Sequence, residues 1–188
     1  MQMTTQILPL LTTDDLIGLP DDGSHYELID GELYVSRAPH ISHQFVLAKL
    51  LQAVMNYLDQ NPVGQIVPEA GVIFDKHNAV IPDLAFMTNE TYQEIVSGGK
   101  MHAAPDLAIE ILSYGAEQEA RDRSLKLRLY GQRGVREYWI VDSRAKTIEI
   151  YHRTRQGLAL ASTLNETDVL TTELLPGFEL QMTKVFDV

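Results

Sequence analysis

Apolar residues recur with the period of an α-helix in two stretches of the chain. Between residues 42 and 60 they return every three or four positions, which predicts a helix with one buried face and with Ser42 as its N-cap. Residues 116–134 show the same spacing, and a glycine at position 131 or 134 can end this second helix. The pattern therefore predicts two long helices, one on each side of the middle of the chain.

Shorter apolar runs predict strands. The runs within residues 25–36 flank Asp30-Gly31, a pair suited to the positive φ angles of a type I′ turn, so we expect an N-terminal hairpin there. Residues 64–75 and 79–87 predict two strands separated by a turn. Residues 106–112 form a nearly continuous apolar run, typical of a strand that is buried on both faces. Three strands therefore follow the first long helix.

The last third of the chain predicts mainly strands. Residues 135–142 and 146–153 form a strand pair joined by a short turn, and strand-like runs follow at residues 158–163 and 178–182. The order of elements is typical of a mixed α/β fold in which helices flank a sheet. No linker, repeat or low-complexity segment interrupts it, so we expect a single domain over residues 1–188.

Composition supports a globular domain and restricts its chemistry. Of the 188 residues, 45% are hydrophobic and 22% charged, which excludes a disordered or collagen-like chain. No apolar run approaches the roughly 18 residues of a membrane span, and the N-terminal segment lacks a basic region, so we expect a cytoplasmic protein without membrane contact. The absence of cysteine excludes disulfides and cysteine nucleophiles, so any metal must be held by oxygen or imidazole ligands.

The net charge of −11 argues against a nucleic-acid-binding domain, because such domains usually present a basic surface to the phosphates. The basic residues are unevenly distributed, however. Six of them fall within sixteen positions: Arg121, Arg123, Lys126, Arg128, Arg133 and Arg136. This cluster leaves a local basic surface open.

Two acidic residues stand inside apolar runs, Asp83 in IPDLAF and Glu110 in LAIEIL. On an extended strand each carboxylate points into the layer of its apolar neighbours, where an ionised group is costly unless a cation compensates it. A divalent metal is a natural compensation for two such groups, and carboxylate oxygens suit Mg²⁺ or Mn²⁺. The alternative for either acid alone is a strand end exposed to water.

The second predicted helix carries charged residues on one face. Glu119, Asp122 and Lys126 lie at positions i, i+3 and i+7, and Tyr130 follows one turn later, so these side chains could reach the site on the sheet. The alternative is a solvated stripe in which Asp122 and Lys126 form an ordinary ion pair, worth about 0.2–0.5 kcal/mol.

Two further side chains have both a structural and a functional interpretation. His43, at the start of the first long helix, either contacts a phosphate or metal or helps to cap the helix. The other five histidines have no partner at ligand spacing, and we interpret them as surface or packing residues. Trp139 could stack on a nucleic-acid base, but a core position is the stronger interpretation.

Several motifs in a fixed order give the chain a family resemblance over residues 25–152. They are ELIDGEL at 27–33, SHQ at 42–44, IPDLAFM at 81–87, PDLAIEILS at 105–113, D-x3-K-x3-Y at 122–130 and GVREYWIVD at 134–142. Together they resemble the Uma-two family, which is proposed to contain bacterial endonucleases of the PD-(D/E)XK superfamily. The resemblance implies a restriction-endonuclease-like domain with a mixed sheet flanked by helices and an N-terminal hairpin.

The resemblance also implies roles for the site residues. Asp83 matches the aspartate of the "PD" motif and Glu110 the second acid, and with the carbonyl of Ile111 they would hold Mg²⁺ or Mn²⁺. Leu112 stands where the general motif has its lysine. In this family the lysine comes from the following helix, and Lys126 matches that position. Lys126 would orient or deprotonate the attacking water, with a pKa that desolvation can lower.

Additional candidates follow from the same comparison. Glu27 resembles a further metal-binding acid of the family, although Glu32 competes for this assignment, and Asp122 and His43 complete the candidate set. The segment Tyr114-Gly115-Ala116 departs from the Pro-Ser-Thr stretch more common in the family.

The candidate residues and the family resemblance leave three possible functions. The leading one is a metal-dependent DNA endonuclease that hydrolyses phosphodiester bonds and acts as a homodimer. The second is a non-catalytic binding or regulatory module that keeps the fold, which the net charge and the altered segment after position 113 favour. A glycosidase with a pair of carboxylates ranks last, because nothing indicates a sugar-binding cleft rich in exposed aromatic residues.

Overall fold

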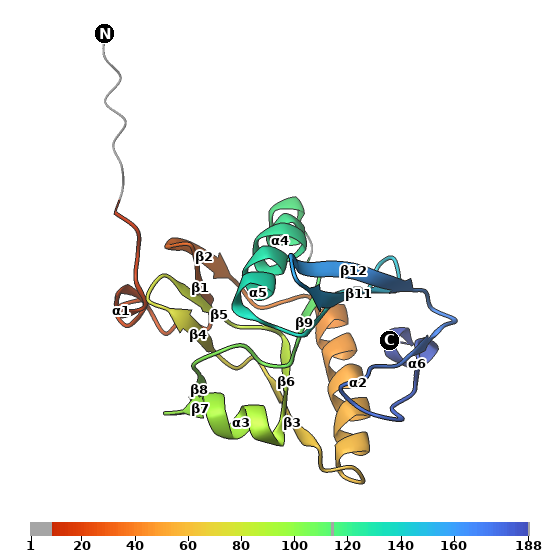
Figure 1. The fold of residues 1–188 in the computed structure, drawn as a ribbon. Coiled ribbons are helices and arrows are strands. Elements are labelled where there is room, and N and C mark those ends of the chain that lie inside the picture. Colours follow the sequence, from red (N-terminus) through yellow and green to blue (C-terminus); the bar gives the residue numbers. More distant parts are fainter. Residues whose placement is uncertain (1–8, 114, 188) are drawn as a thin grey trace.

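The computed structural model describes residues 9–113 and 115–187, which form two mixed six-stranded sheets with helices around them (Figure 1). The first sheet has the strand order β2-β1-β5-β4-β8-β7. Its strands are β1 (His25–Ile29), β2 (Glu32–Ser36), β4 (Val72–Asp75), β5 (Asn78–Val80), β7 (Val96–Ser97) and β8 (Lys100–Met101). The expected mixed fold with an N-terminal hairpin is confirmed.

The second sheet has the order β12-β11-β10-β9-β6-β3, and β9 and β10 are its parallel pair. Its strands are β3 (Gly64–Pro68), β6 (Leu84–Thr88), β9 (Leu107–Ile111), β10 (Glu137–Asp142), β11 (Thr147–Thr154) and β12 (Gly157–Leu164). A short pair near the C-terminus joins β13 (Val169–Leu170) to β14 (Leu180–Gln181).

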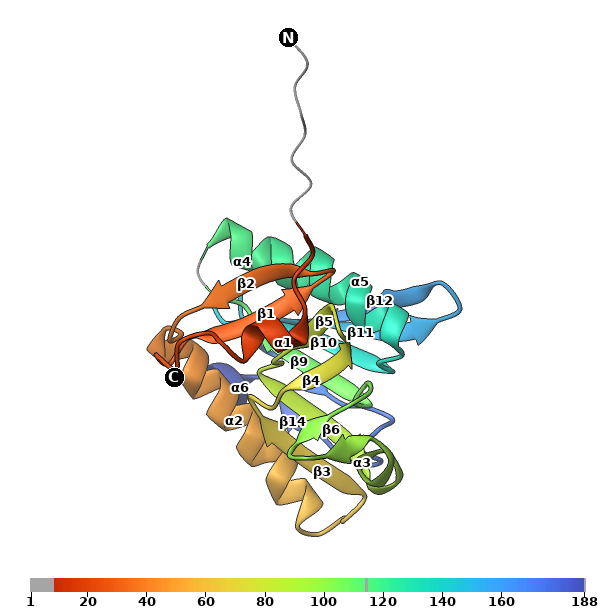
Figure 2. The same cartoon turned by 90° about the vertical axis from the view of Figure 1, so that its left-hand side faces the viewer.

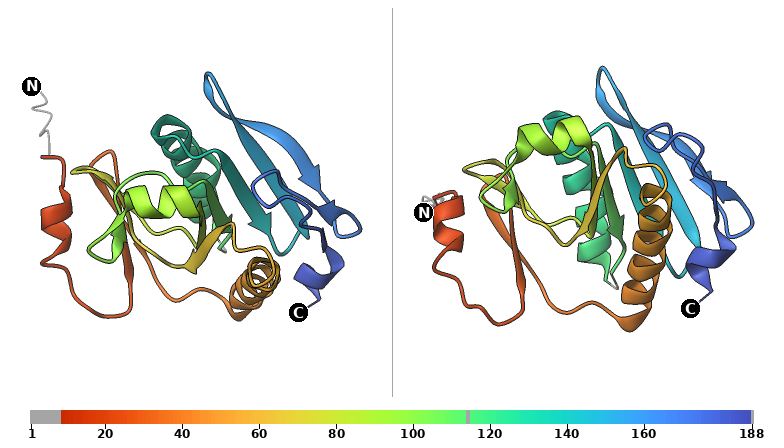
Figure 3. Two further views of the ribbon diagram at one scale, coloured as in Figure 1. Left: turned by 60° about the horizontal axis from the view of Figure 1, so that its bottom comes forward. Right: turned by 90° about the horizontal axis from the view of Figure 1, so that it is seen from below.

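The helices cover these sheets from several sides, as the turned views show (Figures 2 and 3). They are α1 (Thr13–Leu16), α2 (Ile41–Leu58), α3 (Asn89–Ile95), α4 (Ala116–Ala120), the π-helix η1 (Arg121–Lys126), α5 (Leu127–Arg133) and α6 (Thr183–Phe186). None of the helices in the described part of the chain is long and apolar enough to span a bilayer.

The hairpin turn has the backbone that its sequence predicts. Asp30 and Gly31 have φ angles of 53° and 77°, and both positive values are what a type I′ turn requires. Glycine takes this conformation without strain, and aspartate tolerates it better than most residues. The turn therefore fixes the register of β1 on β2, which pairs His25 with Ser36 at the open end of the hairpin.

The predicted strands at residues 64–75 and 79–87 are each divided between the two sheets. The first is interrupted after Pro68, where Glu69 has a φ of 48°, and its halves become β3 and β4. The second is interrupted around Pro82, which has no N–H for a ladder, and its halves become β5 and β6. The second break leaves Asp83 in an irregular segment between the two sheets.

Helix α2 begins two residues earlier than predicted, with His40 and not Ser42 as its N-cap. The backbone of His40 is extended, with a ψ of 150°, and its side chain accepts a hydrogen bond from the N–H of Ser42. Ser42 thus lies inside the first turn. His43 lies on the buried face of the helix, with Val46 and Leu50.

The second long helix has a π-helical turn in its middle. Its end is at Gly134, whose φ of 102° forms a left-handed C-cap, so Gly131 lies within the helix. Wider π turns are often found at functional sites. Here the turn is supported from the sheet, because the hydroxyl of Tyr138 donates to the backbone carbonyl of Asp122 at 3.1 Å. Asp122 and Lys126 both lie in this turn and are buried.

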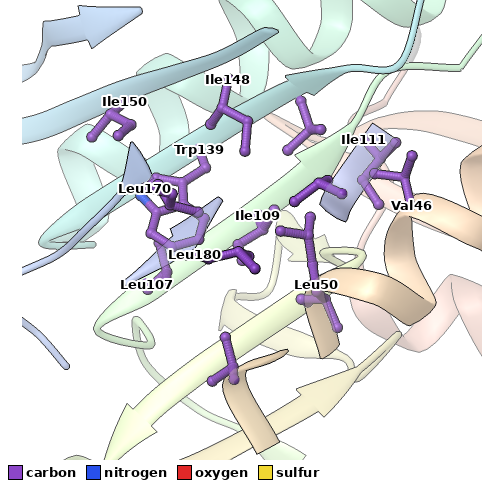
Figure 4. Close-up of a cluster of buried hydrophobic side chains, with 14 of the residues drawn as sticks. Val46, Leu50, Leu107, Ile109, Ile111, Trp139, Ile148, Ile150, Leu170 and Leu180 are labelled. Atoms are coloured by element: carbon purple, nitrogen blue, oxygen red, sulfur yellow. The ribbon is translucent and has the colours of Figure 1, made fainter. Parts of the chain in front are cut away.

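The second sheet separates two apolar cores, and alternation along β9 decides which side chain enters which core. Leu107, Ile109 and Ile111 face the core beneath α2, where Trp139 is fully buried (Figure 4). The structure therefore supports the core interpretation of the tryptophan. Glu110 points to the opposite face, toward η1 and α5.

Candidate functional site

The candidate site is a small pocket of about 40 Å³ at the end of β9, where the hairpin, the segment before β6 and the π-helix meet. All six candidate side chains line it: Glu27, His43, Asp83, Glu110, Asp122 and Lys126. Ile111 lines it as well. Residues more than eighty positions apart in the sequence thus come together in one place.

Asp83 is fixed by two contacts on the same oxygen. Its Oδ2 accepts the backbone N–H of Ile111 at 2.6 Å and lies 3.1 Å from Nε2 of His43. The first contact places the carboxylate beside the peptide that follows Glu110. Within the described residues no hydrogen bond reaches the other oxygen, Oδ1. His43 therefore holds Asp83 in place, and its own pKa is raised because the nearby carboxylates, Asp83 first, outweigh the effect of burial.

Glu110 is 3% exposed and also uses only one of its oxygens. Oε1 accepts from Nζ of Lys126 at 2.9 Å and from the hydroxyl of Tyr130 at 2.8 Å. No hydrogen bond from the described chain reaches Oε2. Asp83 and Glu110 thus each keep one oxygen available at the pocket.

Lys126 is 2% exposed and lies among three carboxylates. Its Nζ is 2.9 Å from Glu110 Oε1, 2.9 Å from Glu27 Oε1 and 3.9 Å from Asp122 Oδ1. Burial alone would lower the pKa of Lys126, but the charges of Glu110, Glu27 and Asp122 outweigh it, so the pKa lies above its ordinary value. The expectation of a lysine with a lowered pKa is therefore wrong, and Lys126 is a fixed cation.

Glu27 connects the hairpin to the π-helix. Its Oε1 accepts the N–H of Ile81 at 2.8 Å as well as facing Lys126, and its Oε2 is 3.6 Å from Arg121. Both oxygens are thus occupied by protein groups, which suits a role in positioning Lys126. The competing Glu32 is exposed and does not line the pocket.

The pocket brings together more carboxyl groups than lysine and arginine side chains of the described chain, and this affects the pKa values of the acids. Burial raises the pKa of Glu110 well above its usual range and that of Asp122 to about 6, although Lys126 opposes both shifts. Asp122 Oδ1 is buried without a hydrogen-bond donor. Since Asp122 and Lys126 are buried, the alternative of a solvated helix stripe is excluded.

The structure separates Glu119 from the other charged residues of its helix. Glu119 pairs with Arg144 and does not line the pocket, because the π turn between it and Lys126 rotates the chain away from regular helical spacing. His25, interpreted above as a surface or packing residue, instead lines the pocket, together with Arg37. Only the hairpin register, which brings positions 25 and 36 together, could have indicated this.

The cluster of six basic residues does not form a free basic surface, because each has an acidic partner. The partners of Arg121, Arg123, Lys126, Arg128, Arg133 and Arg136 are, in that order, Glu27, Glu149, Glu110, Asp30, Asp75 and Asp106. The local basic surface that the sequence left open is therefore neutralised by ion pairs.

The residues at the pocket fit a divalent cation. Its lining includes five carboxyl groups but only three lysine or arginine side chains, and the available oxygens of Asp83 and Glu110 are hard ligands. No three histidine, aspartate or glutamate side chains among the described residues form a ready-made coordination set. Mg²⁺ does not need one, because it keeps several waters and is often bound by only one or two carboxylates.

The fold is similar to that of a solved protein structure. A protein described as "a putative nuclease belonging to DUF820" from Anabaena variabilis superposes with a TM-score of 0.73 at 17% identity, over 94% of this chain and 98% of that one. The type IIG restriction endonuclease BpuSI gives a TM-score of 0.46 at 13% identity, over 79% of this chain and 16% of that one. No curated protein matches the sequence significantly.

The sequence itself identifies the family. A family profile described as "Putative restriction endonuclease" matches residues 13–183, which is nearly the whole chain and includes every residue of the pocket. This match agrees with the order of motifs along the sequence and with the mixed fold. The chain therefore belongs to the Uma2 family.

Proposed function

We propose that the protein is a divalent-metal-dependent endonuclease that hydrolyses phosphodiester bonds in DNA. Membership of the Uma2 family supports a nuclease-type function. The observation that carries the proposal is the pair Asp83 and Glu110. Both line the pocket, and each has one oxygen that accepts no hydrogen bond from the described residues. Asp83 accepts the N–H of Ile111, the residue after Glu110, and a buried lysine donates to Glu110.

Asp83 and Glu110, with the carbonyl of Ile111, would hold Mg²⁺ or Mn²⁺. When bound, such an ion neutralises charge on the phosphate and favours ionisation of a water molecule. Asp83 is oriented for this role by the Ile111 N–H and His43. Glu110 is oriented by Lys126 and Tyr130, which both donate to Oε1.

Lys126 has a different role from that of a general base. Because its pKa is raised, it remains an ammonium ion and can only donate hydrogen bonds or offset negative charge. It would orient the attacking water and compensate charge that develops on the phosphate. Glu27, which also contacts Nζ, would hold the amine in this position.

The test compares DNA cleavage by the wild type with cleavage by Asp83→Asn and Glu110→Gln, using supercoiled plasmid with Mg²⁺ or Mn²⁺. Both substitutions keep the shape of the side chain but remove its charge, so we expect cleavage to fall below detection. Glu119→Gln is the matched control, because Glu119 is a carboxylate of the same helical segment that lies outside the pocket. Wild-type rates in both pocket variants would refute the proposal.

Metal binding is measured separately, by calorimetry and by thermal unfolding with Mn²⁺. A ligand at 100 times its Kd stabilises the native state by about 2.7 kcal/mol. We expect this stabilisation in the wild type and in Glu119→Gln, and its loss in Asp83→Asn. If the wild type binds no metal ion, the alternative of a non-catalytic binding module is favoured. In that case Lys126 would be the cation that compensates Glu110 and Glu27.

Assembly is part of the proposal, because cutting both strands of a duplex commonly needs two sites. We propose a homodimer that acts on DNA in the cytoplasm. Analytical ultracentrifugation, with and without DNA, tests the dimer, and cell fractionation tests the location.

A further inference from the structure

The pocket presents an electrostatic difficulty for the substrate that the proposed function gives it. Its lining includes five carboxyl groups, and a phosphodiester is itself an anion. A metal ion compensates charge at the reacting phosphate only. The neighbouring phosphates of the same strand need cations from the protein.

Two of the three cationic side chains that line the pocket are already engaged. Lys126 is buried between Glu110 and Glu27. The guanidinium of Arg121 lies 3.6 Å from both Glu27 and Asp122 and donates to the hydroxyl of Ser36 at 2.9 Å. Neither can turn away from the pocket toward a neighbouring phosphate without leaving a buried carboxylate unpaired, which is costly.

Arg37 is the third cation and, unlike Lys126 and Arg121, it is not engaged with a carboxylate of the described chain. It is exposed at the rim of the pocket, and the structure gives it no ion pair or hydrogen bond with any other described residue. The backbone before it is held, because Ser36 is paired with His25 in the hairpin and hydrogen-bonded to Arg121. Arg37 thus combines a fixed base with a side chain that is available to a ligand.

We propose that Arg37 binds a backbone phosphate of the DNA strand next to the one that is cut. The inference rests on the proposed function and names one contact of that site. An arginine fork matches the two non-bridging oxygens of a phosphate, and its charge releases counterions from DNA when it binds. Arg37 contributes affinity and strand position, whereas Asp83 and Glu110 perform the chemistry.

The experiment measures binding of a fluorescein-labelled DNA duplex at a series of salt concentrations. Asp83 is left intact so that the site can bind a cation, and Ca²⁺, which also takes carboxylate oxygens as ligands, replaces Mg²⁺ and Mn²⁺ so that binding is measured without cleavage. Arg37→Ala is expected to weaken binding and to lower the slope of log K against log salt by about 1, the loss of one phosphate contact. Arg37→Lys, which keeps the charge, is expected to restore the slope.

The matched control is Arg155→Ala. Arg155 is also an exposed arginine without an ion pair among the described residues, but it lies in the turn between β11 and β12 and does not line the pocket. It is expected to leave the slope unchanged. If Arg37→Ala and Arg155→Ala give the slope of the parent protein, the assignment of Arg37 is overturned while the proposed function stands. If the wild type neither binds nor cleaves DNA, the proposed function fails and this inference fails with it.

Discussion

The β9 and β10 pair carries buried acids at both ends, and the two ends satisfy them differently. At one end lie Asp106, which directly precedes β9, and Glu137, which is the first residue of β10. Each of their four carboxyl oxygens accepts a hydrogen bond. The donors are the Thr88 N–H, Arg136, the Trp139 indole N–H and the Thr172 hydroxyl, at 2.6–3.1 Å.

At the other end the acids are crowded together and incompletely bonded. Asp83, Glu110 and Asp122 each have an oxygen that accepts no hydrogen bond from the described residues. The pKa values follow this difference. Burial raises the pKa of Asp122 to about 6 and raises that of Glu110 well above its usual range. Burial acts on Asp106 as well, but the Thr88 N–H and other donors outweigh it and lower its pKa.

Burial alone therefore does not identify a functional acid. Both ends of the strand pair bury carboxylates among apolar residues, and only at one end does the protein provide enough donors for them. Unsatisfied acids cost stability, and their presence together in one pocket is what the proposed metal site requires. The fully bonded end is interpreted as structural. Four substitutions test this distinction.

The largest effect is expected from Lys126→Met. It leaves Glu27, Glu110 and Asp122 buried without their shared cation, so the free energy of unfolding should fall by about 3–5 kcal/mol. Urea unfolding measures it. Arg128→Met is the control, because that arginine pairs with Asp30 at the surface, where loss of a pair costs at most about 1 kcal/mol.

A double substitution determines whether charge is the cause. Adding Glu110→Gln to Lys126→Met removes one of the uncompensated charges, so part of the lost stability should return. If Lys126→Met is as stable as the wild type, the lysine does not stabilise the buried acids of the pocket. The two ends of the strand pair would then not differ in their need for a cation.

The second effect is expected at the structural end, from Glu137→Ala. It leaves the indole N–H of Trp139 buried without an acceptor and removes the acceptor of the Thr172 hydroxyl, at a cost of about 1–3 kcal/mol. Mn²⁺ binding and the cleavage rate of the folded protein should remain those of the wild type. Glu137→Gln, which retains an acceptor oxygen, should cost less. A loss of metal binding in a folded Glu137→Ala protein would contradict a purely structural role.

Local patterns were sufficient to predict the main elements and the principal candidates. The spacing of apolar residues indicated α2, the Asp30-Gly31 pair indicated the hairpin turn, and the family resemblance indicated Asp83, Glu110 and Lys126. The two elements form where these patterns place them, and Asp83, Glu110 and Lys126 all line one pocket. Such predictions depend only on sequence neighbours or on motifs that keep their order.

The remaining features depend on contacts between distant segments. The sequence of residues 64–75 does not indicate that the two halves of this segment join different sheets, because the sheet that each half joins depends on strands far along the chain. A π turn has no periodicity signal of its own, so regular helical spacing puts Glu119 on the face of Lys126, whereas in the structure Glu119 pairs with Arg144 outside the pocket. The ion pairs of the basic cluster likewise form with acids from other elements, so the charge pattern alone cannot decide whether these six residues present a basic surface.

A smaller effect, dependent on pH, is expected from Asp106→Asn. The folded pKa of Asp106 is lowered, so its contribution to stability is fully present above the unfolded value of about 3.9 and is lost as the pH falls through the folded value. The wild type should therefore exceed the variant in stability above about pH 5, and this advantage should shrink as the pH falls below about 4. Urea unfolding across this range measures both. A constant difference down to the lowest pH would show that the Asp106 charge is not the stabilising feature.

The smallest effect is expected from Arg136→Ala, which removes the only charged donor to Asp106 in the described chain. The Arg136 side chain is 58% exposed, so its ion pair is screened by solvent and should contribute about 0.2–1 kcal/mol, decreasing with added salt. The Thr88 N–H remains on the other oxygen of Asp106. Comparing urea unfolding at low and high salt therefore separates the two donors. A larger, salt-sensitive loss in the free energy of unfolding would mean that Asp106 also depends on a counter-charge, as the acids of the pocket do. A small loss means that neutral donors are enough to stabilise a buried acid at this end of the strand pair.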